Sequence, residues 1–426
     1  MSTRTPAPLS ATPEGTFRYA SRFDEHQKNG FFNYSGQGLS LSSFGIGTYK
    51  GEVSEQADEA WAASIHLGLQ SGVNVLDTAI RYRAMRSERV IGRVLKKFLG
   101  NGEVQRDEIF VSSKGGLVSI PEKEERHYYV EETLVRRRKI SADRIYKSMH
   151  CLDVEFLEKE IETSLDNLEL KKLDCYFLHN PELSLSLLGM EQFYHNLHQV
   201  FTMLEAQVES GNIAAYGIAS WNGFRRREGD CWYIDIERLI SIARAVAGEK
   251  HHFKYLELPL SVGMPFIYNN SITAPDGTKM PFLERTRALE LDVFASASLY
   301  EGKLKELFNL QRLMGMAGVS DSEHNEGPVQ ISLPVSENSV IQLFEVLVAS
   351  RNLGSLLETK ITNLSGNRLA TYPAALNVIR SLPEITCTLA GMEKVDYLAE
   401  SLQLTKIPKI KLAQLRKFLA SLSLSS

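Results

Sequence analysis

The amino-acid sequence predicts an α/β fold, a (β/α)8 barrel with long loops at the C-terminal face of its parallel strands. Short apolar runs alternate with amphipathic helical segments, an order that is typical of parallel α/β architecture. Eight strand–helix units can be counted, which is the number that closes such a barrel. The length of 426 residues suits a single barrel with insertions, since these domains commonly have ~250 residues or more.

Helices and strands are predicted from apolar periodicity and from residues that start or stop a helix. The segment Val154–Leu168 has Asp153 as its N-cap and one apolar stripe, and Gly72 and Gly248 each follow a helix. The expected helices are Gln56–Gln70, a helix with Ser87 as its N-cap, Val154–Leu168, Leu187–Val208, Ile234–Ala247, Pro281–Glu290, Thr371–Ser381, Glu393–Leu402 and Lys409–Leu419. The expected strands include Gly72–Leu76, Glu108–Ser113, Leu173–His179, Ile213–Ala219, Phe253–Leu258, Asp292–Ala295 and Ile385–Leu389.

Composition and charge narrow the class of protein. The chain is 43% hydrophobic and 23% charged, as expected of a globular enzyme, and its net charge of −4 argues against a nucleic-acid partner. No apolar run reaches the ~18 residues of a membrane span, so no membrane partner is expected. The four cysteines form no CxxC pair, which fits a reducing compartment and predicts a cytoplasmic protein. Residues 1–13 suit a disordered tail better than a transit peptide.

Four polar residues stand at or near the ends of three predicted strands. Asp77 and Tyr82 follow the first of them, Lys114 follows the second, and His179 ends the third. Each alone is more often a capping, rim or structural residue than a catalyst. Barrel enzymes, however, hold their chemistry at the carboxyl ends of the strands. A phenol with a free pKa near ~10 needs a neighbouring cation to exchange protons at neutral pH, and that cation needs a counter-ion.

These residues lie in motifs that resemble the aldo-keto reductase family. The motifs are LSSFGIGTY at 41–49, DTAxxYxxxxSExxxG at 77–92, VSSK at 111–114 and LEKEIETSLDNLELKKLDCYFLHNP at 157–181, with weaker matches at 216–222, 298–302 and 389–402. The resemblance implies a TIM barrel with the catalytic tetrad Asp77, Tyr82, Lys114 and His179. In such a site Lys114 would lower the pKa of Tyr82, Asp77 would hold Lys114 charged, and His179 would donate a hydrogen bond to the carbonyl oxygen.

The same resemblance implies an NAD(P)H-dependent reduction of a carbonyl to an alcohol, or the reverse, on a small-molecule carbonyl or alcohol substrate. NADP is the expected cofactor and NAD is the alternative, because Lys394 is the only basic residue in 391–401 and Glu393 stands beside it. No metal is expected. The implied cofactor-binding residues are Gly47, Thr48, Tyr49, Ser220, Glu257, Ser298, Leu299, Gly391, Met392 and Lys394.

Three positions depart from the family pattern around the nicotinamide ring. Ala219 stands where a serine is common, Glu257 stands where a glutamine is usual, and Ser296 stands where an aromatic residue usually stacks on the ring. Trp221 is another aromatic side chain that could supply a stacking face. No Arg or Lys is identifiably directed at the substrate pocket, so sugar, steroid, quinone and other carbonyls all stay open.

The expected organisation is an N-terminal extension over 1–39, the barrel over 40–408, and a C-terminal helix over 409–426. Insertions near 115–151 and 303–360 follow strand ends, where long connections act either as lids or pocket walls or as decoration. A second function class stays open: barrels of this family also serve as nucleotide-binding regulatory subunits of channels. A barrel isomerase or lyase without cofactor would leave the match at 389–402 unexplained.

Overall fold

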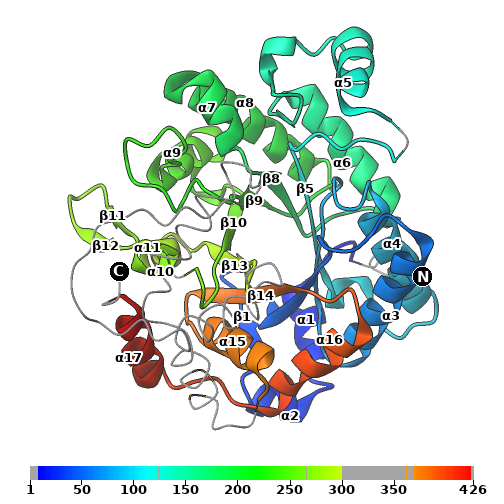
Figure 1. Ribbon diagram of the computed structural model, residues 1–426, viewed down its shortest axis with the longest axis vertical. Coiled ribbons are helices and arrows are strands. Elements are labelled where there is room, and N and C mark those ends of the chain that lie inside the picture. The colour runs from blue at the N-terminus through cyan, green and yellow to red at the C-terminus, as the bar shows by residue number, and fades with distance from the viewer. Residues whose placement is uncertain are drawn as a thin grey trace, which may run out of the picture.

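The computed structural model describes residues 8–122, 124–264, 266–299, 361, 364 and 369–423. Eight parallel strands close a barrel in which every strand pairs with its neighbours in the sequence, and the last strand pairs with the first (Figure 1). The predicted (β/α)8 fold is therefore confirmed. The strands are β3 (Phe44–Gly47), β4 (Val75–Asp77), β5 (Phe110–Gly115), β8 (Cys175–His179), β9 (Tyr216–Ala219), β10 (Phe253–Pro259), β13 (Asp292–Ser296) and β14 (Ile385–Gly391).

Helices surround the barrel (Figure 1), and most lie close to their predicted positions. They are α3 (Glu55–Gln70), α4 (Arg86–Gly100), α6 (Val154–Leu168), α7 (Glu182–Leu188), α8 (Met190–Glu209), α9 (Ile236–Ala247), α11 (Phe282–Ala288), α15 (Thr371–Arg380), α16 (Val395–Ser401) and α17 (Leu412–Ser423). The single helix predicted over Leu187–Val208 is wrong, because Gly189, with a φ of 74°, separates α7 from α8.

The predicted N-cap of α4 is also wrong. The chain enters α4 through Arg83, Ala84 and Met85, whose φ angles are 50°, 51° and 71°. Ser87 lies inside the helix, and its hydroxyl donates to the Thr48 carbonyl at 2.8 Å. Because the Ser87 hydroxyl is bonded to the loop after β3, it does not cap α4.

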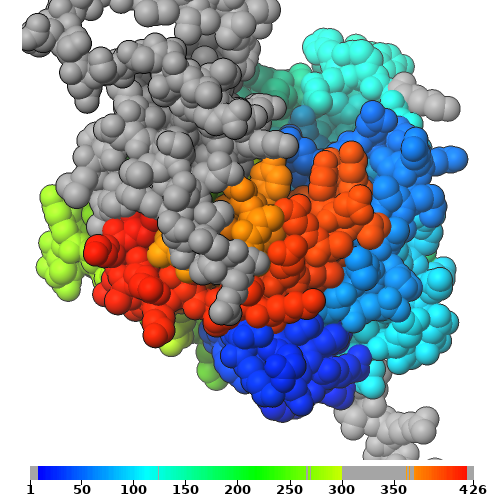
Figure 2. Space-filling view, turned by 60° about the horizontal axis from the view of Figure 1, so that its bottom comes forward, coloured from blue at the N-terminus to red at the C-terminus, as the bar shows by residue number. Residues whose placement is uncertain are grey.

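The N-terminal segment covers one end of the barrel. It contains α1 (Pro13–Ala20), α2 (Asp24–Lys28) and the antiparallel pair β1 (Phe32–Tyr34) and β2 (Ser40–Ser42). The amide of Ser42 donates to the Asn74 side chain at 2.7 Å, just before β4, so the hairpin lies at the amino-terminal end of the strands. Figure 2 shows this blue segment against the orange and red elements near the C-terminus, where the Asn29 side chain donates to the Thr405 carbonyl.

A disordered tail over residues 1–13 is contradicted for residues 8–13, which the structure describes. The amide of Ala11 donates to the buried carboxylate of Asp174 at 2.5 Å, and the amide of Thr12 donates to the Asp107 carbonyl at 3.0 Å. Thr12 also caps α1 through its side chain. These bonds to the barrel replace the hydrogen bonds that a disordered tail would make with water.

Side chains facing the barrel interior form an apolar cluster. They include Val75, Phe110, Phe177, Tyr255 and Phe294. The Phe110 ring packs between those of Tyr255 and Phe294, with centroid distances of 5.4 and 5.3 Å. Because side chains alternate between the two faces of a strand, the residue two positions further along each strand also faces inward. Those next inward residues are polar, and they form the site described below.

Residues 116–151 form a substructure of their own between β5 and α6. It contains α5 (Arg126–Tyr129), a π-helix (Val130–Arg137), and the antiparallel pair β6 (Ile145–Tyr146) and β7 (His150–Cys151). It projects from the barrel beside α6 (Figure 1). A smaller addition after β10 contains α10 (Phe266–Asn269), β11 (Ser271–Thr273) and β12 (Lys279–Pro281). The predicted insertion over 303–360 lies outside the described residues. Within the described residues, no helix is long and apolar enough to cross a membrane.

Candidate active site

A layer of polar side chains lies at the carboxyl-terminal end of the barrel, above the apolar interior. Asp77 is two residues beyond Val75, His179 is two beyond Phe177, and Glu257 is two beyond Tyr255. Each therefore faces inward by the two-residue repeat of a strand. Strand register places Asp77 beside Ser112 and Gly47, and Ala219 beside both His179 and Glu257.

Lys114 is fully buried and lies among oxygen acceptors. Its ammonium donates to Asp77 Oδ2 and, at 3.0 Å, to the Thr78 carbonyl, and it lies 3.1 Å from Glu257 Oε2. Burial alone would lower the pKa of Lys114, but the two carboxyl groups outweigh burial and raise it above its usual value. Ser112 donates a further hydrogen bond to Asp77 Oδ1 at 2.7 Å, which fixes the orientation of that carboxylate.

Glu257 is a second carboxyl group on the same lysine. Burial raises its pKa to about 8, the charge of Asp77 adds to this effect, and Lys114 opposes it. At neutral pH the Glu257 carboxyl is therefore mostly protonated. The spacing of Glu257 from Tyr255 indicates that it faces inward, but its contact with Lys114 joins two strands that are not neighbours in the barrel.

Tyr82 lies in the loop after β4, against the other members of the predicted tetrad. Its ring meets the His179 ring edge-on at 5.7 Å and the Tyr49 ring at 5.1 Å. The Lys114 ammonium lies 5.2 Å from the centre of the Tyr82 ring. Lys114 lowers the pKa of Tyr82, as expected from the sequence, but burial has the larger effect and raises the net pKa above its usual value.

The loop that carries Tyr82 is held by an unusual turn. Arg83, Ala84 and Met85 all adopt the left-handed backbone region, at a cost of order 1–3 kcal/mol for each residue. The buried Arg83 side chain anchors the turn, donating to the Glu52 carbonyl at 2.8 Å and to Asp58 at 2.5 Å. Its rigid guanidinium joins this loop to the start of α3.

His179 is neutral in this environment. Burial lowers its pKa well below the usual value, and the positive charge of Lys114 acts in the same direction. His150, from β7, contacts the His179 carbonyl through Nε2 at 2.9 Å and Ser184 Oγ through Nδ1 at 2.7 Å. His179 Nδ1 is buried and has no hydrogen-bond partner among the described residues.

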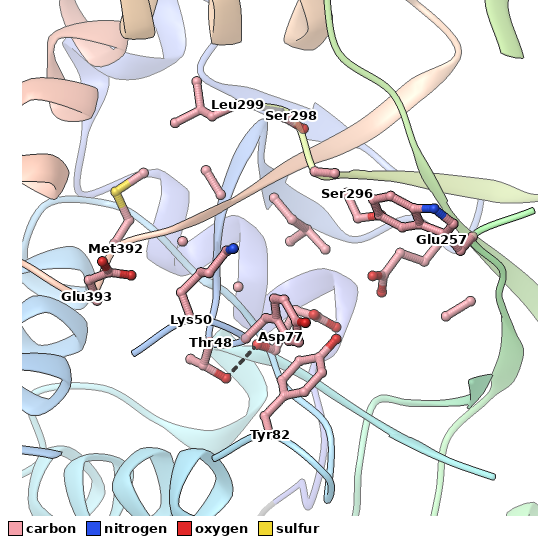
Figure 3. Close-up of a pocket in the computed structure, with 18 of the residues that line it drawn as sticks. Thr48, Lys50, Asp77, Tyr82, Glu257, Ser296, Ser298, Leu299, Met392 and Glu393 are labelled. Atoms are coloured by element: carbon pink, nitrogen blue, oxygen red, sulfur yellow. Dashed lines mark hydrogen bonds between the residues drawn. The ribbon is translucent and has the colours of Figure 1, made fainter. Parts of the chain in front are cut away.

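A cavity of about 720 Å³ opens over this polar layer, a size typical of ligand sites. Figure 3 shows Asp77, Tyr82 and Glu257 around its floor and Met392 and Glu393 at one side. Lys114 lies beneath the floor, and Lys394 is absent from the described lining. The other predicted site residues all line it: Gly47, Thr48, Tyr49, Asp77, Tyr82, His179, Ser220, Glu257, Ser298, Leu299, Gly391 and Met392.

Two basic residues in the lining were not predicted. Lys50 follows the predicted Tyr49, and Arg81 immediately precedes Tyr82. The expectation that no Arg or Lys is directed at the pocket is therefore wrong. Both lie in loops after strands, where no periodicity predicts the direction of a side chain. Their adjacency to predicted site residues was the available signal.

The lining beside β9 and β13 has few groups suited to holding an aromatic ring. The Ser220 hydroxyl is buried and accepts a hydrogen bond from the Gly223 amide at 2.8 Å. Trp221 lines the cavity, and the guanidinium of Arg225 lies 5.6 Å from its ring centre. Ser296 also lines the cavity, so the aromatic residue of the family pattern is missing at that position.

The end of the cavity near α16 has an acidic lining. Glu393, Tyr397 and Glu400 all face it. Lys394 instead lies over the ring of Tyr397, with its ammonium 5.5 Å from the ring centre. This arrangement offers carboxylates at the place where the sequence predicts a phosphate contact.

Comparison with known proteins gives consistent matches. Residues 43–228 match the model of the Aldo/keto reductase family. An NADPH-dependent D-xylose reductase from Meyerozyma guilliermondii is 24% identical over 238 residues, covering 52% of this chain and 60% of that protein. An NADH-specific methylglyoxal reductase from Escherichia coli is 24% identical over 198 residues, covering 45% of this chain and 52% of that protein. The chain spans about half the length of the curated relatives it matches.

A solved structure shares the overall fold. The glycerol dehydrogenase from Gluconobacter oxydans superposes with a TM-score of 0.55 at 17% identity. The superposition covers 92% of this chain and 94% of that structure. The likeness confirms the barrel architecture beyond the region that matches the family model.

Proposed function

Because residues 43–228 match the model of the Aldo/keto reductase family, we propose that the chain is an NAD(P)H-dependent oxidoreductase that reduces an aldehyde or ketone to an alcohol, or catalyses the reverse reaction. One observation carries this proposal. The ring centroids of Tyr82 and His179 are 5.7 Å apart at the floor of a cavity, directly over the buried ion pair of Lys114 and Asp77. This arrangement supports a proton donor and a neutral hydrogen-bond donor that would act on one carbonyl oxygen.

The volume of the cavity and the basic side chain of Lys50 in its lining both suit a nicotinamide dinucleotide. Lys50 lines the cavity beside Gly391, since a Cβ added to that glycine would be 3.7 Å from the stem of the lysine side chain. The ammonium group of Lys50 would contact a pyrophosphate. Ser220 and Trp221 would hold the nicotinamide end. When bound, the reduced nicotinamide supplies the hydride that the carbonyl carbon accepts.

The protein residues would manage the proton. Burial keeps Tyr82 protonated, which is the state required to donate a proton to the carbonyl oxygen as it becomes an alcohol. Lys114 stabilises the phenolate that Tyr82 becomes, and Asp77 keeps Lys114 in place. Neutral His179 donates a hydrogen bond to the same carbonyl oxygen.

NADP is the cofactor predicted from the sequence, and the xylose reductase relative is NADPH-dependent by its name. NAD is the second candidate, and a specific observation favours it. Glu393 and Glu400 line the cavity, whereas Lys394 does not, and carboxylates repel a 2′-phosphate but accept hydrogen bonds from ribose hydroxyls.

The direct test is Tyr82→Phe. The variant should lose ~10²-fold or more in turnover of a carbonyl panel, because the proton donor is removed. Binding of NADPH and NADH, followed by their fluorescence, should stay close to wild type. Turnover at the wild-type rate would contradict the assignment, and loss of cofactor binding would show that Tyr82 shapes the cavity rather than donating a proton.

A further inference from the structure

Two arginines near the cavity each have a buried guanidinium nitrogen without a hydrogen-bond partner among the described residues. Arg81 lines the cavity and immediately precedes Tyr82, and Arg126 begins α5 in the 116–151 substructure. In both, the unpartnered atom is Nη1. Arg83 also has a buried Nη1 without a partner among the described residues, but its charge is paired, because its Nη2 binds the carboxylate of Asp58; Arg86 binds the same carboxylate.

Within the part of the chain that the structure describes, no carboxylate forms an ion pair with Arg81 or Arg126. Burial lowers the pKa of Arg81, and the positive charge of Arg126 lowers it further. The carboxyl group of Glu160 acts in the opposite direction, but burial raises its own pKa to about 8, so it is mostly protonated at neutral pH. Buried charges in proteins are normally paired, so an unpaired guanidinium at a cavity wall calls for an anionic ligand.

Arg81 and Lys50 lie beside different elements of the structure. The Arg81 loop is joined to the 116–151 substructure, because the Ser119 hydroxyl donates to the Ile80 carbonyl at 3.1 Å. Leu117 and Met149, from the two ends of that substructure, line the same cavity. Lys50 lies beside β14 instead. The stem of Lys50 thus lies next to Gly391 and its ammonium lies 5.5 Å from the Tyr49 ring centre, whereas the loop of Arg81 is bonded to the 116–151 substructure.

We propose that Arg81, supported by Arg126, binds an anionic group of the carbonyl substrate, either a carboxylate or a phosphate. The proposal rests on the proposed reductase function and names its substrate class. A guanidinium presents five donors in a fixed fork that matches both kinds of anion. Because Arg81 is adjacent in sequence to Tyr82, the anion would also orient the carbonyl toward the proton donor.

Matched substrates test the proposal. The first pair is 4-formylbenzoate and 4-formylbenzamide, which have similar shapes and differ in charge, and the second is glyceraldehyde 3-phosphate and glyceraldehyde. Wild type should favour one anionic member by ~10- to 100-fold in kcat/KM, as expected of charge-assisted hydrogen bonds. Arg81→Met should abolish this preference and leave the neutral substrate within about threefold. Arg126→Gln should reduce the preference in the same direction. The pair that shows the preference identifies the anion as carboxylate or phosphate.

Two further measurements make the result specific. Arg93→Met is the control, because Arg93 is a half-exposed arginine of α4 that pairs with Glu59, and it should behave as wild type. Arg81→Met should melt no lower than wild type without ligand, since it removes an unpaired buried charge. Cofactor dissociation constants should not change in Arg81→Met, whereas weaker cofactor binding would assign the arginine to the dinucleotide and overturn the proposal.

A binding measurement without turnover separates this proposal from the proposed function. For a carboxylate ligand, calorimetric titration compares the product-like 4-(hydroxymethyl)benzoate with the uncharged 4-(hydroxymethyl)benzamide. For a phosphate ligand, the titrant is inorganic phosphate. Binding of an anion that is lost in Arg81→Met supports the site even if no carbonyl is reduced. Turnover with no charge preference in wild type, or equal losses on both members of a pair in Arg81→Met, would overturn the anion site and leave the reductase assignment intact.

Discussion

Lys114 shares its charge between two carboxyl groups, Asp77 and Glu257, in a site with almost no contact with solvent. The second carboxyl group has a direct effect on the proposed proton donor, because the charge of Glu257 raises the pKa of Tyr82 while Lys114 lowers it. Protonation of Glu257, with its pKa of about 8, therefore determines how well the lysine can stabilise a Tyr82 phenolate at a given pH.

Replacing Lys114 with methionine should affect both stability and activity. The variant leaves Asp77 buried without its cation, which should lower the free energy of unfolding by roughly 3–5 kcal/mol. Activity should fall as well, because Tyr82 loses the group that favours its ionised form. Chemical denaturation and the carbonyl assay measure the two effects.

The double variant Lys114→Met/Asp77→Asn is the control for this prediction. It removes the carboxylate that Lys114→Met leaves without its cation, so part of the lost stability should return while activity stays low. A Lys114→Met protein that is inactive but as stable as wild type would show that Asp77 is hydrated and that the pair is not buried in solution.

The sequence predicts single residues well where a motif fixes them and poorly where only the tertiary structure does. The motifs located Asp77, Tyr82 and His179, and all three line the cavity. The contact between Lys114 and Glu257 crosses the barrel interior between β5 and β10, so no local pattern reports it. Arg81 lies in the loop between β4 and α4, where no periodic pattern predicts the direction of a side chain.

Among the elements, the 116–151 substructure has the clearest connection to the cavity. Its two ends are joined, because the Val118 amide donates to the Met149 carbonyl at 2.8 Å and the Cys151 amide donates to the Gly116 carbonyl at 2.8 Å. Leu117 and Met149, at these joined ends, line the cavity. We propose that the substructure forms part of the substrate pocket.

Replacing residues 120–147 with a short Gly-Ser connection tests this role. The joined ends stay in place, so the barrel should still fold, while Arg126 and the outer helices are lost. We expect a changed substrate preference and a higher KM, with cofactor dissociation constants near those of wild type. Equal loss of substrate and cofactor binding would indicate a role in folding instead.

We propose that the region around α16 determines the choice of cofactor. If Lys394 moves from Tyr397 to a 2′-phosphate on binding, Lys394→Ala should weaken NADP by ~10- to 100-fold and leave NAD unchanged. If Glu400 sets the choice, Glu400→Gln should improve NADP binding relative to NAD, because a carboxylate is removed from the lining. Dissociation constants of both cofactors for the two variants decide between them, and a Lys394→Ala protein with unchanged NADP affinity excludes the lysine contact.

Elements were predictable where local signals agree with the packing. Val154–Leu168 has the predicted limits in the structure, because Asp153 accepts from the Glu155 amide at 3.1 Å and the apolar stripe packs inward. The start of α4 was not predictable, since Ser87 bonds to the Thr48 carbonyl instead of capping its own helix. Helix α17 begins at Leu412 rather than at the predicted Lys409, whose ammonium reaches the Asn33 side chain.

For the whole molecule, buried acids determine how stability changes with pH. Glu160 accepts a hydrogen bond from the Gly116 amide at 2.7 Å, and burial raises its pKa to about 8 from an unfolded value near 4.5. The folded state therefore holds a proton that the unfolded state has released. The contribution of Glu160 to stability should be largest below its unfolded pKa and should fall by about 1.4 kcal/mol per pH unit between the unfolded and the folded pKa.

Glu160→Gln tests this dependence. The amide can still accept the Gly116 hydrogen bond but cannot ionise, so the contribution of this residue to the slope disappears. Denaturant unfolding at about pH 5.5 and about pH 8 should show the variant gaining stability relative to wild type as the pH rises. An unchanged difference between the two proteins at both pH values would mean that Glu160 is already ionised in the folded state.

The pairing of β14 with β3 also has a consequence during synthesis. The first barrel strand leaves the ribosome early, but its partner on that side is made only after most of the 426 residues have been added. At ~5–20 residues per second this delay is on the order of a minute or less. Throughout that time β3 has an exposed edge, which can pair with other chains. The nascent protein should therefore depend on chaperones most strongly just before β14 emerges.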